Sequence, residues 1–207
     1  LDIRGAGDLL GADQSGFINE IGFEMYQRIL DEAIEELKED KFQKLFKDEK
    51  KRFTVKDCQL DTDEEVLIPD DYVSNIEERL NLYKELNQIK DNDSLISFEQ
   101  KLKDRFGKLP DKIAILFNAI KLRWVGKKLG FEKIVLKNNS LRAFFTTDKN
   151  SNYFESIYFK KIMNYLRENP NDCQVKENRG KLSLRKEGIM EINQALGLFN
   201  KLINQKT

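Results

Sequence analysis

The chain has 207 residues, of which 40% are hydrophobic and 35% are charged, enough for a buried core in one large domain or two small ones. It has no histidine, which rules out a Ser-His-Asp or Cys-His catalytic site, and no Gly-x-x-x-x-Gly-Lys-Ser/Thr loop to hold nucleotide phosphates. We therefore do not expect these residues to form an enzyme by themselves.

The formal net charge is zero, but the charges are unevenly distributed. Residues 1–93 carry 13 basic and 25 acidic side chains, whereas residues 94–207 carry 23 basic and 11 acidic ones. This asymmetry is typical of two units that have different partners or that dock on each other. Solvated faces of ordinary helices would give the same pattern.

The two cysteines, Cys58 and Cys173, lie far apart in the sequence. Without histidine they offer no zinc constellation, so we expect reduced structural thiols and no metal site. The chain shows neither a signal peptide nor an uncharged apolar segment long enough to span a membrane. A cytoplasmic location without membrane contact is the expectation.

The first sixteen residues are the most distinctive stretch of the chain. They contain four glycines, at Gly5, Gly7, Gly11 and Gly16. Glycines so closely spaced favour a tightly folded backbone, which would present Arg4 and Gln14 at fixed positions. Alternatively, the glycines only make turns and Arg4 caps a carbonyl group.

The segment from Glu20 to Asp40 has apolar residues at helical spacing and carboxylates on the opposite face, which predicts an amphipathic helix and the second arm of a helical hairpin. Basic residues then dominate Lys41 to Lys56, a candidate contact for a nucleic-acid backbone or simply a solvated helix end and linker. Phe53 to Ile68 alternates loosely and predicts an extended hook or hairpin.

Pro69 marks the expected domain boundary, because proline cannot donate to a strand ladder and the aspartates after it suit a helix N-cap. We therefore divide the chain into residues 1–68 and 69–207. A first helix is predicted from about Tyr72, and a second from a cap at Asp93 or Ser94 to Gly107. A third is predicted to start at Pro110 and stop at Gly130.

Two β-hairpins alternate with two further helices in the rest of the chain. Their turns are predicted at Asn138-Asn139 and at Asn178-Arg179-Gly180, because these residues tolerate positive φ. Asn152-x-x-Glu155 is a capping box that predicts the start of the fourth helix, and Ile189 to Asn204 predicts the last. The order ααα-ββ-α-ββ-α indicates an α+β domain with a small antiparallel sheet.

Several of these stretches resemble transcription-repair coupling factors. The opening Ile-Arg-Gly-Ala-Gly, Leu-Leu-Gly and Gln-Ser-Gly are similar to the translocation motif that this family shares with branch-migration helicases of superfamily 2. Further similarities to the family's C-terminal module follow in order: Leu67 to Val73, Glu78 to Lys84, Asp104 to Pro110 and Lys128 to Gly130.

The resemblance implies the C-terminal fragment of an ATP-dependent DNA translocase that displaces stalled RNA polymerase and recruits nucleotide excision repair. Residues 1–68 would be the end of the second motor domain, with its translocation motif and hook. Residues 69–207 would be an autoinhibitory module that docks on the N-terminal repair-protein-binding module of the same protein. ATP and Mg would belong to the parent protein, not to this fragment, and the parent would act on duplex DNA.

The resemblance also implies roles for particular residues. The translocation element would comprise Arg4, Gly5, Gly7, Gln14 and Gly16. The guanidinium of Arg4 can form hydrogen bonds with a phosphate, a carboxylate or a carbonyl group, and the amide of Gln14 can bridge the two arms of a hairpin. We therefore expect Arg4 and Gln14 to couple the ATP state to DNA movement.

Asp104 is the candidate contact to the partner module. The alternative is a surface carboxylate paired with Lys101 or Lys108. Two other functions remain open for the fragment: a nucleic-acid-binding accessory module, favoured by the basic residues 94–207, and an inert structural module of a helicase.

Overall fold

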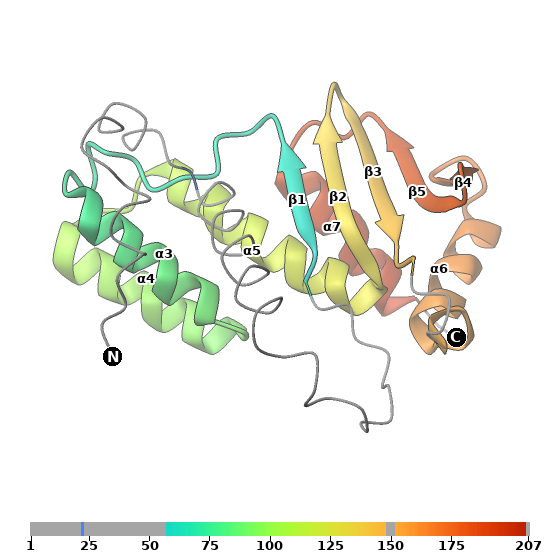
Figure 1. Cartoon of the computed structure of the whole chain (residues 1–207), viewed down its shortest axis with the longest axis horizontal. Helices are drawn as coiled ribbons and strands as arrows, with labels where there is room; N and C mark the ends of the chain where they lie inside the picture. The colour runs from blue at the N-terminus through green and yellow to red at the C-terminus, as the bar shows by residue number, and fades with distance from the viewer. Residues whose placement is uncertain (1–21, 23–56, 148–151, 206–207) are drawn as a thin grey trace, which may run out of the picture. The chain divides into compact units, whose positions relative to one another are not determined.

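A computed structural model describes residues 22, 57–147 and 152–205 of the chain (Figure 1). The described residues belong to two compact units. The first, which we call the helical unit, holds residues 22 and 66–113. The second, the sheet unit, holds residues 57–65, 114–147 and 152–205.

The helical unit is built on two helices, α3 (Ile76–Gln88) and α4 (Asn92–Phe106). The side chain of Asn75 caps α3 by accepting from the backbone N–H of Glu78 at 2.9 Å. Asp91 caps α4 by accepting from the N–H of Ser94 at 2.8 Å, so the sequence-based cap at Asp93 or Ser94 was wrong. Asp91 fits because its extended backbone leaves its carboxylate facing the first-turn amides.

The sheet unit contains one five-stranded sheet with the strand order β1-β2-β3-β5-β4. The strands are β1 (Gln59–Thr62), β2 (Phe131–Lys137), β3 (Ser140–Phe145), β4 (Gln174–Asn178) and β5 (Lys181–Glu187). The helices connected to it are α5 (Asp111–Leu129), α6 (Ile157–Glu168) and α7 (Ile192–Asn204), with a short 3-10 helix, η2 (Asn152–Glu155). The order after residue 69 is ααα-ββ-α-ββ-α, which confirms the predicted α+β class.

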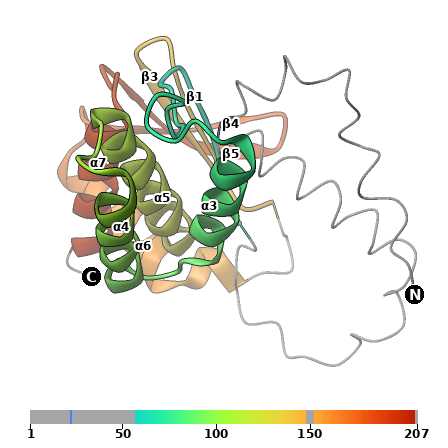
Figure 2. The same ribbon diagram turned by 90° about the vertical axis from the view of Figure 1, so that its left-hand side faces the viewer.

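Helices α5 and α7 lie on the same side of the strands (Figure 2). The ring centroids of Phe131 on β2 and Phe199 on α7 are 5.1 Å apart, and both side chains are fully buried. A β-carbon at Gly126 of α5 would meet Ile134 at 2.9 Å and Phe199 at 3.5 Å, so the missing side chain lets α5 approach the sheet. The core of this unit therefore lies between one face of the sheet and its helices.

Both predicted hairpin turns are confirmed. Asn138 and Asn139 have φ of 53° and 57° between β2 and β3, and Arg179 and Gly180 have φ of 50° and 76° between β4 and β5. Gly107 ends α4 as predicted, but with φ of 86° and ψ of −155° it is not in the left-handed helical conformation of a common C-cap; glycine readily adopts this backbone conformation.

Two details of the sequence-based fold were wrong. The sheet is mixed rather than antiparallel, because β1 pairs in parallel with β2. Residues 152–155 form the separate helix η2, and α6 starts later with Ser156 as its N-cap, accepting from the N–H of Phe159 at 3.2 Å. The residues of the predicted capping box therefore form η2, and they do not cap α6 as expected.

β1 comes from the segment that was expected to form a hook before Pro69, yet it is an edge strand of the sheet. The carboxylate of Glu64, just after β1, accepts a hydrogen bond from the backbone N–H of Ile192 at the start of α7. The sheet thus includes residues from before Pro69. The functional division at Pro69 itself stays a prediction.

Cys58 and Cys173 are both free and buried. In the described part of the chain no helix is long and apolar enough to cross a bilayer, and no group of three or more potential metal ligands gathers.

Candidate partner-docking surface

The segment before α3 is anchored to the helical unit by two buried side chains. The backbone N–H of Ile68 donates to the hydroxyl of Tyr83 at 2.8 Å. Arg79, only 5% exposed, donates to the carbonyls of Val73 and Ser74 at 2.6 and 3.2 Å. Burial raises the pKa of Tyr83, so its hydroxyl remains neutral at neutral pH.

A second anchor joins this segment to the end of α4. The hydroxyl of Tyr72 lies 3.1 Å from the carbonyl oxygens of both Leu102 and Gly107. Its ring lies 5.7 Å from that of Phe106, centroid to centroid, and the guanidinium of Arg105 stacks 5.0 Å from the same Phe106 ring. The stretches that carry the resemblance, 67–73, 78–84 and 104–110, therefore meet in the helical unit.

Ion pairs connect the exposed sides of α3 and α4. Lys101 contacts Glu85 at 2.6 Å, and Arg105 contacts Glu78 at 2.8 Å. Pairs as exposed as these contribute at most about 1 kcal/mol each, but they hold two cations of α4 toward α3. The charge on this part of α4 is thereby locally neutralised.

Asp104 keeps its carboxylate at the surface of α4. It accepts a hydrogen bond from the side-chain amide of Gln100, one turn earlier, at 2.8 Å. The pairing with Lys101 that the sequence left open is absent, since Lys101 contacts Glu85 instead. Within the described residues Asp104 contacts no cation, Lys108 included, so its negative charge is available to a partner.

An exposed apolar side chain lies on the same helix. Ile96 is 54% exposed and precedes Gln100 by four residues, which places the two on one face of α4 together with Asp104. We call Ile96, Gln100 and Asp104 the α4 stripe. Ile96 was not identified from the sequence as a surface residue. Its position could have indicated this, because Leu95, Phe98 and Leu102 have the spacing of the buried face of a helix and Ile96 does not fall on that face. The stripe combines an apolar contact, an amide and an unpaired carboxylate, as protein-binding surfaces commonly do.

The predicted translocation element lies elsewhere. Arg4, Gly5, Gly7, Gln14 and Gly16 are outside the described residues, as is the basic segment from Lys41 to Lys56. Their roles stay predictions, as does a contact between Asp104 and a partner module.

Comparison with known proteins gives consistent matches. The family model described as the TRCF domain matches residues 62–156. The transcription-repair-coupling factor of Escherichia coli (strain K12) is 35% identical over 134 residues, which are 65% of this chain and 11% of that protein. That of Buchnera aphidicola subsp. Acyrthosiphon pisum is 37% identical over 139 residues, or 67% and 16%. The chain thus spans less than a fifth of the length of these curated relatives.

A further relative and one solved structure extend the comparison. The transcription-repair-coupling factor of Staphylococcus aureus (strain USA300) is 28% identical over 160 residues, or 77% of this chain and 13% of that protein. A crystal structure of the C-terminal domain of a transcription-repair coupling factor aligns with a TM-score of 0.51 and 20% identity, covering 69% of this chain and 93% of that one. This structural likeness supports the α+β fold.

Proposed function

We propose that this chain, which belongs to the transcription-repair coupling factors and corresponds to their C-terminal part, regulates a larger DNA translocase instead of catalysing a reaction itself. The parent protein would use ATP and Mg to move on duplex DNA, displace a stalled RNA polymerase and recruit excision-repair proteins. Residues 1–68 would transmit the state of the motor, and residues 69–207 would mask a second surface until the motor engages.

The observation that carries the masking role is the unpaired carboxylate of Asp104. The nearby cations Lys101 and Arg105 are already bound to α3, and the exposed Ile96 lies two helical turns away on the same face of α4. A cation of another module could pair with Asp104 while an apolar side chain covers Ile96. Such a contact is of the kind that a rearrangement of the motor can release, because interfaces of ordinary size are held by modest net free energies.

The masking role is tested in the full-length parent protein by Asp104→Lys. Charge reversal should weaken the dock and thereby increase the affinity for the excision-repair partner, approaching the gain produced by deleting residues 69–207. Glu177→Lys is the matched control, because it makes the same charge change on an exposed residue of β4, in the sheet unit. Partner affinity can be measured by surface plasmon resonance with and without ATP.

The outcomes separate the alternatives that the sequence left open. An inert structural module predicts the same partner affinity for the deletion, for Asp104→Lys and for the unchanged protein. A gain on deletion without a gain for Asp104→Lys would retain masking but exclude the α4 stripe as its surface. Circular dichroism of the 207-residue chain carrying Asp104→Lys or Glu177→Lys establishes that each substitution leaves the chain folded.

The transmission role is tested separately by Arg4→Ala in the parent protein. We expect DNA binding and most ATP turnover to remain while displacement of a stalled polymerase is lost, because the guanidinium would relay the nucleotide state and not bind the nucleotide. Unimpaired displacement would rule out this role for Arg4.

A further inference from the structure

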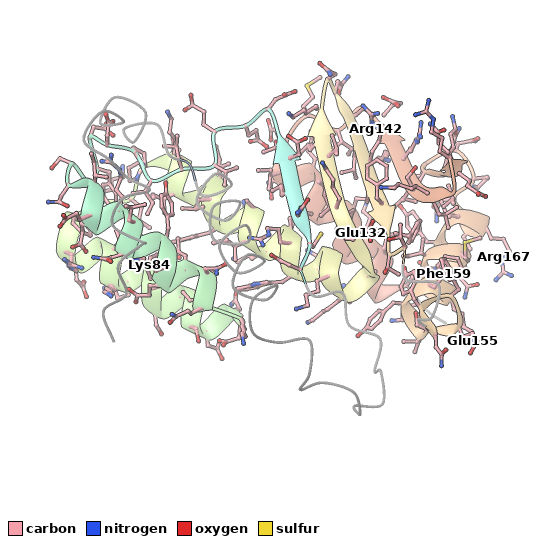
Figure 3. The ribbon with its side chains drawn as sticks, viewed as in Figure 1. Lys84, Glu132, Arg142, Glu155, Phe159 and Arg167 are labelled. Atoms are coloured by element: carbon pink, nitrogen blue, oxygen red, sulfur yellow. The ribbon has the colours of Figure 1, made fainter. Side chains whose placement is uncertain are left out.

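The face of the sheet opposite its helices carries a regular pattern of side chains. Side chains of successive strand residues alternate between the two faces, so the strand register assigns each one to a face. Leu141, Ala143 and Phe145 of β3 are buried on the helix side, which leaves Ser140, Arg142 and Phe144 on the other face. Arg142 is labelled on β3 in Figure 3.

The register aligns this face into two rows that cross the strands from β2 to β4. One row reads Lys133, Phe144, Ser183 and Lys176. The next row reads Val135, Arg142, Arg185 and Gln174. We call these eight residues the open sheet face; Ser183 is fully buried among its neighbours, and the other seven are partly or fully exposed.

The open sheet face is strongly cationic, since its eight residues include four cations and no carboxylate. Two carboxylates border it: Asp61 on β1 is paired with Lys137 at 2.6 Å, and Glu187, two residues after Arg185, accepts a hydrogen bond from the hydroxyl of Ser140 at 3.2 Å. Neighbouring strands are about 4.8 Å apart and alternate residues along a strand about 7 Å apart, so four positive charges lie within an area of about 14 by 7 Å. Such a density favours a polyanionic ligand.

Two of these cations face each other directly. Arg142 is paired in register with Arg185, and within the described residues neither contacts a carboxylate. Like charges in directly opposed positions destabilise a sheet, unless an anion between them relieves the repulsion. Arg185 also donates from Nε to the hydroxyl of Ser183 at 3.2 Å, which leaves its remaining donors for a ligand.

The aromatic ring of Phe144 favours a nucleic acid over other polyanions as the ligand of this face. Its ring is partly exposed, lies in register between Lys133 and Ser183, and has no ring partner among the described aromatic residues. Nucleobases stack on such rings when a single strand crosses a sheet, and the phosphates on either side are then bound by Lys and Arg. A duplex keeps its bases stacked inside and could not use this ring.

From this juxtaposition we propose that the open sheet face binds a single-stranded nucleic acid. About two or three nucleotides would span it, with one base on Phe144 and phosphates at Arg142, Arg185 and the two lysines. This inference does not rest on the docking role of α4, which is in the other unit.

The test uses the full 207-residue chain and a fluorescein-labelled oligothymidylate of about 12 nucleotides, a length within the usual site sizes for single strands. Fluorescence anisotropy gives Kd at several salt concentrations. An oligouridylate and a blunt duplex of the same length are measured in parallel. Binding of either single strand more tightly than the duplex supports the proposal, and the preferred sugar identifies the ligand as DNA or RNA.

Two variants separate phosphate contacts from stacking. Arg142→Gln with Arg185→Gln should weaken binding and reduce the slope of log Kd against log salt by about 1.4, since each phosphate contact on a single strand contributes about 0.7. Phe144→Leu should weaken binding at least about fivefold and leave the slope unchanged, because stacking releases no counterions. If the double variant fails to fold, Arg185→Gln alone should reduce the slope by about 0.7.

The matched control is Lys128→Gln with Lys201→Gln, which removes two exposed charges from α5 and α7. It should change Kd little. An equal loss in this control would overturn the proposal, as would duplex binding that equals single-strand binding, equal affinity for polyglutamate, or no effect of Phe144→Leu.

Discussion

The ring of Tyr153 lies against Gly130, so that a β-carbon on this glycine would fall 2.0 Å from the Cε2 of the tyrosine. The hydroxyl of Tyr153 donates to the carbonyl of Leu129, and its ring lies 6.0 Å from Phe145 and 5.6 Å from Phe159, between centroids. Helix η2 is thereby attached to the junction between α5 and β2. A glycine is required there both by this contact and by its φ of 86°.

Gly130→Ala should therefore destabilise the protein by about 3 kcal/mol, combining the strain of a left-handed residue with overpacking against the ring. Gly107→Ala is the matched control, because Gly107 has the same φ of 86° but no atom within 4 Å of the added carbon. Its backbone strain alone should cost about 1 to 2 kcal/mol, less than the loss at Gly130. Urea denaturation measures both, and equal losses would show that the ring contact contributes nothing.

The order of the α-helices and hairpins from residue 76 to 204 could be predicted because their signals are local, although η2 and two helix starts were missed. Gly107 ends α4 and Asn138-Asn139 turns the β2–β3 hairpin, each through a backbone conformation that the residue type favours. The strand β1 was not recognised as part of the sheet, because its pairing with β2 joins residues more than seventy positions apart. No local pattern in Gln59 to Thr62 encodes that parallel partner.

The candidate surfaces were predictable to different degrees. Asp104 was identified by the resemblance. That Lys101 does not pair with it could not be predicted, because Lys101 pairs instead with Glu85 on another helix. The opposition of Arg142 to Arg185 depends on the register of two strands separated by α6 and β4. From the sequence, Lys41 to Lys56 was instead identified as the basic cluster. Basic residues that are neighbours in the sequence can be recognised without a structure, whereas basic residues on different strands cannot.

The two thiols should be unreactive in the folded protein. Burial raises the pKa of Cys58 to about 12, only partly offset by the nearby Arg123, and burial likewise raises the pKa of Cys173 to about 12. At pH 8 the reactive thiolate is therefore scarce and shielded. Ellman's reagent should titrate neither cysteine until a denaturant is added, when both should react. Fast reaction of one thiol in native buffer would contradict its buried position.

Asp172 should make stability depend on acid pH. Burial alone would raise the pKa of the Asp172 carboxyl. Hydrogen bonds from Lys186 and Tyr165 outweigh burial and hold this pKa below its ordinary value. A lowered folded-state pKa contributes stability above the unfolded value of about 3.9, and this stability is lost as the pH falls through the folded value. The free energy of unfolding should thus decrease below about pH 4.

Asp172→Asn should cost about 2 kcal/mol at pH 7, which is the usual contribution of a hydrogen bond to a charged group, and the difference from the unchanged protein should shrink as the pH falls below about 4. Asp61→Asn is the control. The side chains of Asp61 and its partner Lys137 are 41% and 36% exposed, so their ion pair should contribute less than about 1 kcal/mol. Chemical denaturation across this pH range measures both variants. A pH-independent loss for Asp172→Asn would show that its charge is not what stabilises the fold.

Two helical glycines should respond in opposite directions to the same substitution. Gly197 is exposed in the interior of α7 and has no atom within 4 Å of an added β-carbon, so Gly197→Ala should raise stability by about 0.5 to 1 kcal/mol through its higher helix propensity. At Gly126 of α5 the same carbon would meet Ile134 at 2.9 Å and the sulfur of Cys58 at 3.0 Å. Gly126→Ala should lower stability by about 1 to 3 kcal/mol, because overpacking there outweighs the gain in propensity. Thermal unfolding followed by circular dichroism should show Tm rising for the first variant and falling for the second; a rise for both would mean that α5 can move away from the sheet at little cost.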